Sequence, residues 1–179
     1  MSRAWEGAQA AGAQARLFLA LWPSEGVRAR IVAWREACAF PAGAVPVAAA
    51  QLHVTLHFIG AVPRADLDRI ADGVAVAPGA FDVRLGAPRL WHGGLAVLEP
   101  HDEPPALRDL HARLGQALRD LGLPVEARPY RPHVTLARHA QGARLPTEGP
   151  ALRWRARSHV LVESRPGATG GYAVLRRYG

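Results

Sequence analysis

One tetrapeptide that carries an acid–base group occurs twice in this chain. His-Val-Thr-Leu stands at residues 53–56 and again at 133–136, although the chain holds only eight His and four Thr. Each copy lies in an apolar, β-branched run, which predicts a β-strand. Side chains alternate along a strand, so His and Thr should share one face while Val and Leu share the other. Two such strands facing one cleft would present paired imidazoles and hydroxyls.

Paired imidazoles of this kind suit general acid–base chemistry at phosphorus. An unperturbed His titrates near pH ~6.5, so one ring can be neutral while another is protonated. His53 and His133 would divide the proton transfers, each worth ~10²–10⁴-fold in rate. Thr55 and Thr135 would donate to phosphate oxygens, and Arg138 would neutralise charge. Arg138 follows His133 at an odd offset, so it reaches the same face only if the strand ends or bulges.

Two other interpretations of the motifs stay open. A single His-x-Thr on a strand is usually a packed or solvent-facing pair, and the identical second copy is what favours a site. A metal site would use His53 and His57, which a regular strand places on one face, together with His133. Neither motif brings a carboxylate or a Cys at ligand spacing, so the sequence favours chemistry without a metal. No role is assigned to His57.

The basic charge of the chain comes entirely from arginine. The 179 residues carry a net charge of +7 and include no Lys. Genomic base composition would also enrich Arg, but guanidinium groups bind phosphates in either case, which favours a nucleic-acid or nucleotide partner. The single Cys38 excludes an intrachain disulfide, and no apolar run reaches membrane-spanning length. We expect a soluble, cytoplasmic monomer without a signal peptide.

The elements expected along the chain define an α+β protein. Residues 1–15 lack periodicity and should form a flexible N-terminal extension before a single bilobal domain at 16–179. Strands are expected at 16–22, 52–59, 81–85, 90–91, 95–98, 132–138, 158–163 and 171–178. Helices are expected over about 24–34, 66–74 and 104–121. In each half a helix precedes the His/Thr strand. This order predicts two pseudo-symmetric lobes with antiparallel sheets, a central cleft and helices packed outside.

The residues around both motifs resemble the 2H phosphoesterase superfamily, whose members carry two His-x-Thr motifs at this spacing. The sequence LHVTLHFIG at 52–60 resembles the first family motif, and RPHVTLAR at 131–138 resembles the second. The opening strand and the closing Gly171-Tyr172 narrow the resemblance to the RNA 2′,3′-cyclic phosphodiesterases of bacteria and archaea, also called 2′-5′ RNA ligases. The resemblance covers about residues 16–178.

The resemblance implies hydrolysis of RNA 2′,3′-cyclic phosphate ends to 2′-phosphates, without metal or cofactor, and the reverse 2′-5′ ligation. RNA, including tRNA fragments, or a cyclic nucleotide would be the partner. It implies that His53 and His133 are the acid–base pair, and for hydrolysis we expect His53 to protonate the 3′-oxygen and His133 to activate water. By the same resemblance, the phosphate would be contacted by Thr55, Thr135 and Arg138. Tyr130 would stack on the terminal base. Two alternatives remain: an enzyme acting on a small cyclic nucleotide or 2′-5′ oligonucleotide, and a non-catalytic protein that binds RNA ends.

Overall fold

Strands and helices alternate along most of the chain. A computed structural model describes residues 14–165 and 171–179. Its strands are β1 (Gln14–Leu21), β2 (Val45–Pro46), β3 (Val54–Pro63), β4 (Phe81–Trp91), β5 (Leu95–Pro100), β6 (Val134–Arg138), β7 (Leu152–Ala156), β8 (His159–Ser164) and β9 (Tyr172–Tyr178). Its α-helices are α2 (Glu25–Arg35), α3 (Leu67–Gly73) and α4 (Pro105–Asp120), and its 3-10 turns are η1 (Ala49–Gln51) and η2 (Arg64–Asp66).

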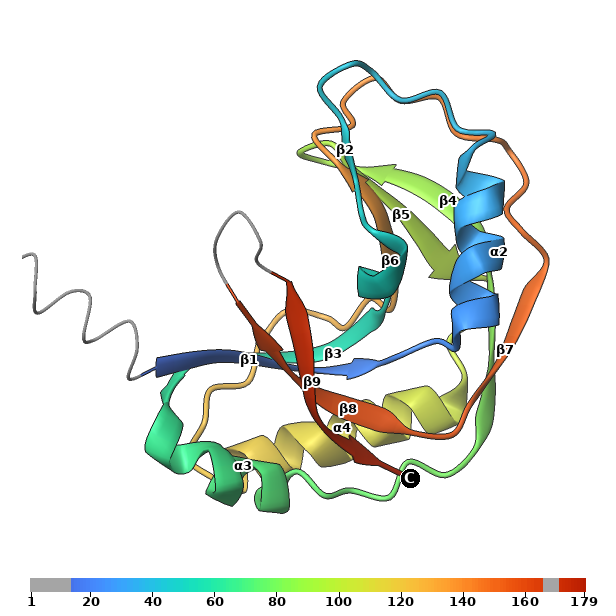
Figure 1. Ribbon diagram of the computed structural model, residues 1–179. Coiled ribbons are helices and arrows are strands. Elements are labelled where there is room, and N and C mark those ends of the chain that lie inside the picture. Colours follow the sequence, from blue (N-terminus) through green and yellow to red (C-terminus); the bar gives the residue numbers. More distant parts are fainter. Residues whose placement is uncertain (1–13, 166–170) are drawn as a thin grey trace, which may run out of the picture.

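The described strands form one sheet that curls through both halves of the molecule (Figure 1). The order is β7-β4-β5-β6-β3-β1-β8-β9, with β2 paired to β6, and the pairing is antiparallel throughout. The two motif strands, β3 and β6, are neighbours at the middle of this order. The predicted α+β class is therefore confirmed, and the two expected sheets are halves of one continuous sheet.

The helices pack against the outer side of the curled sheet (Figure 1). Helix α4 has apolar residues at every third or fourth position, and this stripe faces the core. The buried leucines of the stripe are Leu107, Leu110, Leu114 and Leu118. Burying each contributes about 1.5–3 kcal/mol. Helix α2 begins after Ser24, whose hydroxyl accepts a hydrogen bond from the Val27 amide, and buries Ile31. In the described part of the chain, no helix has the length and apolar character needed to cross a membrane.

Several element boundaries differ from the sequence-based expectation. Strand β1 begins at Gln14, so Ala15 is a buried strand residue rather than part of an extension. Strand β4 continues to Trp91 instead of stopping at Leu85. Strands β2 and β7 lie in stretches that were expected to be loops. Residues 1–13 of the expected extension and the expected turn at 166–170 lie outside the described residues.

Candidate active site

The two motifs meet at the centre of the sheet. The antiparallel pair Val54–Val134 relates them by an approximate two-fold axis, and continuing that register sets each His opposite the Thr of the other motif. The Val and Leu residues of both motifs are buried, as the alternation predicted. The other face lines a cavity of about 650 Å³. All six predicted site residues border this cavity: His53, Thr55, Tyr130, His133, Thr135 and Arg138.

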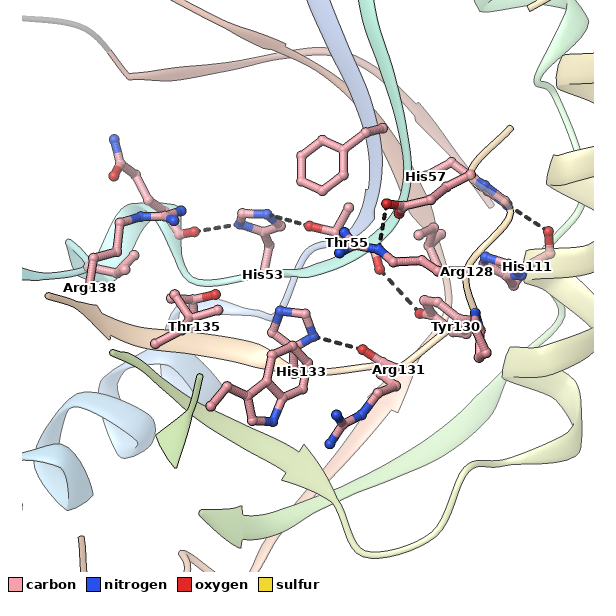
Figure 2. A pocket seen from close by; sticks show the side chains of 18 of the residues that line it. His53, Thr55, His57, His111, Arg128, Tyr130, Arg131, His133, Thr135 and Arg138 are labelled. Atoms are coloured by element: carbon pink, nitrogen blue, oxygen red, sulfur yellow. Dashed lines mark hydrogen bonds and ion pairs between the residues drawn. The ribbon is translucent and has the colours of Figure 1, made fainter. Parts of the chain in front are cut away.

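Each motif His is held by a main-chain carbonyl two residues before it. His53 Nδ1 lies 2.6 Å from the Gln51 oxygen, and His133 Nδ1 lies 2.7 Å from the Arg131 oxygen. A carbonyl can only accept, so each Nδ1 carries a proton and each Nε2 lone pair is free in the neutral ring. Nε2 of His53 accepts from the Thr55 hydroxyl at 3.1 Å. Figure 2 shows the two rings on neighbouring strands, facing the same space.

The two imidazoles have unlike aromatic neighbours. The rings around His53 lie 5.0–5.3 Å from it between centroids and belong to Phe18, Trp22 and Tyr172. The indole of Trp22 is nearly parallel to His53, with 10° between the ring planes. His133 instead packs against Trp91, with 4.3 Å between centroids. His53 therefore lies in the more apolar environment.

A carboxylate distinguishes the surroundings of His133. Glu99 accepts hydrogen bonds from Trp91 Nε1 at 3.1 Å and from the Arg131 guanidinium at 2.7 Å. The Arg131 guanidinium also lies 4.3 Å from the centre of the Trp91 ring. Arg131 thus holds His133 through its carbonyl and Trp91 through its side chain. No sequence pattern indicates this network, because its members come from β4, β5 and the loop before β6.

These surroundings lower the pKa of both rings. Burial lowers the pKa of His53 to about 4, and the nearby His133 and Arg138 add to this effect, whereas the hydrogen bond to the main-chain carbonyl opposes it. Burial likewise lowers the pKa of His133, and the charges of Arg131 and Arg128 add to this effect, whereas its carbonyl acceptor and the charge of Glu99 act in the opposite direction. Both rings therefore favour the neutral form, and His133 is the one that a carboxylate helps to protonate.

Arg138 reaches the cavity because β6 bulges. Residues 135 and 137 pair with the consecutive residues 97 and 96 of β5, so Leu136 is an extra residue in the strand. The bulge reverses the alternation: Leu136 and Ala137 are both buried, and Arg138 emerges on the side of Thr135. Figure 2 shows Arg138 in the same pocket as both motif His residues. The break that the odd offset required is thus present.

An equivalent bulge in β3 places His57 on the face opposite to the one expected. Residues 55 and 57 pair with the consecutive residues 20 and 19 of β1, so Leu56 is the extra residue. His57 is 4% exposed, and its Nε2 donates to the carbonyl of His111 in α4 at 2.8 Å. Phe58 is 57% exposed on the cleft face, and His57 borders the same cavity beside His111. The expectation that His53 and His57 share a face is wrong.

The new position of His57 also removes the geometric basis for the metal alternative. That alternative needs the rings of His53, His57 and His133 on one side of the sheet. Across residues 14–165 and 171–179, no three His, Cys, Asp or Glu side chains come together in a way that could hold a metal ion.

Tyr130 is the last ring of an aromatic column between α4 and β3. Its ring stacks on His111 with 3.9 Å between centroids, and His111 stacks on His57 with 4.0 Å. Its hydroxyl donates to the Thr55 carbonyl at 3.2 Å. Burial raises the pKa of Tyr130 far above its usual range, so the phenol remains a donor. Because His111 covers one face of the ring, only the other face is available for the predicted base stacking.

The fold and the paired motifs define a class of proteins built on two His-x-Thr strands in one curled sheet. The chain belongs to the 2′-5′ RNA ligase superfamily, whose sequence profile matches residues 23–164. It is 32% identical to the RNA 2′,3′-cyclic phosphodiesterase of Thermus thermophilus, in an alignment that covers 91% of this chain and 89% of the relative. It is 30% identical to the Escherichia coli protein of the same name, over 83% of each chain.

Solved structures give the same result. The crystal structure of E. coli LigT in the apo form matches with a TM-score of 0.83 at 27% identity, covering 93% of this chain and 97% of LigT. LigT has also been crystallised with 3′-AMP and with NADP+. The family resemblance carried by the two motifs is thus confirmed.

Proposed function

We propose that this chain is an RNA 2′,3′-cyclic phosphodiesterase that opens a terminal cyclic phosphate to a 2′-phosphate without a metal ion. The observation that carries the proposal is the pair of imidazoles, each with its Nδ1 proton held by a carbonyl and its Nε2 facing one cavity. The names of two relatives that align over most of their length support the same substrate class.

The proposed reaction divides two proton transfers between the rings. One Nε2 takes a proton from water while the water oxygen bonds to phosphorus. The other Nε2–H gives a proton to O3′ while the P–O3′ bond breaks, which leaves a 2′-phosphate and a 3′-hydroxyl. The hydroxyls of Thr55 and Thr135 donate to the non-bridging oxygens, and Arg138 offsets the growing negative charge. The Thr55 hydroxyl exchanges its bond to His53 for one to phosphate.

The unequal surroundings support His133 as the acid and His53 as the base. This assignment is the reverse of the one expected from the sequence. The carboxylate of Glu99 favours the protonated form of His133, although Arg131 and Arg128 oppose it. Burial among aromatic rings favours the neutral form of His53, and no carboxylate opposes this effect. Because burial lowers both pKa values, the negative charge of the bound phosphate is needed to complete the protonation of His133.

Turnover of nucleoside 2′,3′-cyclic phosphates, and of short RNAs with that end, tests the proposal. We expect 2′-phosphate products by phosphorus NMR, full activity in EDTA, and a loss of about 10²-fold or more for His53→Ala and for His133→Ala. His101→Ala, which removes an exposed imidazole outside the cavity, is the matched control. Near-normal turnover in either motif variant, with an intact circular dichroism spectrum, would contradict the proposal.

A panel of substrates tests which RNA or nucleotide the protein accepts and whether it hydrolyses or ligates RNA ends. Cyclic mononucleotides, 2′-5′ dinucleotides and tRNA halves with cyclic phosphate ends separate the small-substrate alternative from the RNA one. Addition of an RNA with a 5′-hydroxyl tests 2′-5′ ligation. RNA binding without turnover at any pH from 5 to 9 would indicate a non-catalytic protein that binds RNA ends. The protein is expected to act as a monomer, and light scattering during gel filtration measures this.

A further inference from the structure

A second cavity, of about 380 Å³, is lined in part by Trp22, one of the aromatic rings around His53. Trp22 connects the two sites, because it stacks on His53 and also lines the second cavity. The remaining walls come from the start of α2, the segment from β7 to β8, and the end of β9. Segments far apart in the sequence thus converge next to the first motif His.

The second cavity is strongly basic. Four of its lining residues are arginines, namely Arg28, Arg155, Arg157 and Arg177, and the acidic residue among the lining is Glu25. Arg155 is also paired with Asp82, which lies outside the lining, at 3.5 Å. Two guanidiniums are oriented by uncharged oxygens: Arg28 donates to the Pro23 carbonyl at 2.7 Å, and Arg177 donates to the Ser158 hydroxyl at 2.9 Å. These acceptors occupy some of the N–H groups and neutralise no charge, so both guanidiniums keep further donors for an anion.

Guanidinium groups next to an exposed aromatic edge suit single-stranded RNA. Arginines contact backbone phosphates, and an aromatic ring accommodates a base or a sugar without sequence preference. Trp22 is half-buried, lines the second cavity and stacks on His53, which lines the first. An RNA that ends in a 2′,3′-cyclic phosphate continues only in the 5′ direction, so any additional phosphate contact belongs to a preceding nucleotide.

We propose that the second cavity binds a backbone phosphate on the 5′ side of the reacting end, with the RNA strand crossing Trp22. The inference rests on the proposed function for the direction of the strand. With this second site, affinity depends on the length of the RNA. A mononucleotide fills the first cavity alone, whereas an oligonucleotide fills both. The ligand class is the phosphodiester backbone, and base identity plays no part in its recognition.

The double variant Arg157→Ala/Arg177→Ala tests this site by binding. Both side chains are exposed, so the fold should be retained, and a thermal melt checks this. The probe is a 5′-fluorescein RNA pentamer ending in a 2′-phosphate, followed by fluorescence anisotropy. We expect the Kd to rise about tenfold, the lower end of what removing a charge-assisted hydrogen bond costs. The slope of log K against log salt should fall by about 0.7 for each phosphate that the variant no longer binds.

The matched control is Arg108→Ala/Arg119→Ala, which removes the same charge from the exposed side of α4. Its Kd for the pentamer should change by less than about twofold, because general attraction is screened within about 10 Å at 0.1 M salt. For turnover, Arg157→Ala/Arg177→Ala should raise the KM of a pentamer with a cyclic phosphate end and leave a nucleoside 2′,3′-cyclic phosphate unaffected.

Two results would overturn the inference: equal weakening of pentamer binding in both double variants, or no weakening in Arg157→Ala/Arg177→Ala. A failure of the proposed function looks different. In that case the unmodified protein turns over no cyclic phosphate of any length, while the binding comparison between the two double variants still decides the inference.

Discussion

Mild acid should destabilise this protein, because several of its imidazoles are buried in the uncharged form. Burial is the main cause that lowers the pKa of His53 and of His111 to about 4, from 6.5 in an unstructured chain. Between these two pH values the unfolded chain binds more protons than the folded one. The contribution to stability is therefore complete above pH 6.5 and is lost progressively as the pH falls towards 4.

The size of the effect follows from those pKa values. For His53, the difference between 6.5 and about 4 corresponds to about 3 kcal/mol at full protonation, of which about 2 kcal/mol is already lost at pH 5. His111 is more open to solvent, and we count about half as much for it. Together they predict a loss of about 3 kcal/mol between pH 7 and pH 5. Burial lowers the pKa of His57, His133 and His159 as well, which adds to the loss.

Urea unfolding at pH 7, 6 and 5, followed by tryptophan fluorescence, measures this loss directly. The variant His111→Phe keeps an aromatic ring in the column and removes one titrating group, so its free energy of unfolding should depend less on pH. His101→Gln, at an exposed position, is the matched control. An unfolding free energy that changes by less than about 0.5 kcal/mol between pH 7 and pH 5 would refute the reasoning.

Three further predictions concern single side chains. Glu99→Gln keeps an acceptor for Trp91 but removes the charge that raises the pKa of His133. The alkaline limb of the pH profile of kcat/KM should therefore move to lower pH. Movement of the acid limb would instead make His133 the base. Tyr130→Phe removes the hydrogen bond to the Thr55 carbonyl and should lower the urea-derived stability by about 1 kcal/mol, with a smaller kcat; unchanged stability would contradict the bond. Leu114→Ala should cost about 2–5 kcal/mol in the same unfolding assay, because the residue is fully buried in α4, and a loss below 1 kcal/mol would argue against that packing.

The parts of the site that follow from simple alternation could be predicted from the sequence. The inward Thr and outward Val and Leu of both motifs depend only on three or four regular strand residues. Beyond Leu56 and Leu136 the prediction for the first motif fails, because a bulge reverses the alternation and sends His57 into the core. For Arg138 the sequence could state that a bulge was needed, but alternation alone cannot say whether one exists.

The network around Glu99 could not be predicted for a different reason. Its acceptor and the Trp91 donor are eight residues apart and meet only through the register of the β4–β5 hairpin. The sequence does predict that hairpin, at His92-Gly93-Gly94, and both glycines have the positive φ angles that the turn requires. Which side chains face each other across it depends on the length of the turn, which sets the register from Trp91–Leu95 to Ala87–Glu99 and is not encoded in a local pattern.

The bulges at the last residue of each identical tetrapeptide have a consequence for the regiochemistry of ring opening. A half-turn of the substrate about the two-fold axis would exchange O2′ and O3′ between the two imidazoles. One orientation would yield a 2′-phosphate and the other a 3′-phosphate, and four identical residues in each motif cannot distinguish them.

The fifth residue after each motif His does distinguish them. Both bulges turn that residue towards the cleft, and it is Phe58 in one half and Arg138 in the other. A nucleotide rotated by a half-turn would have to exchange the groups that contact the apolar ring and the guanidinium. The base and the phosphate of a nucleotide are chemically unlike, so they cannot be exchanged in this way. We therefore expect these two side chains, which transfer no proton, to favour one of the two orientations.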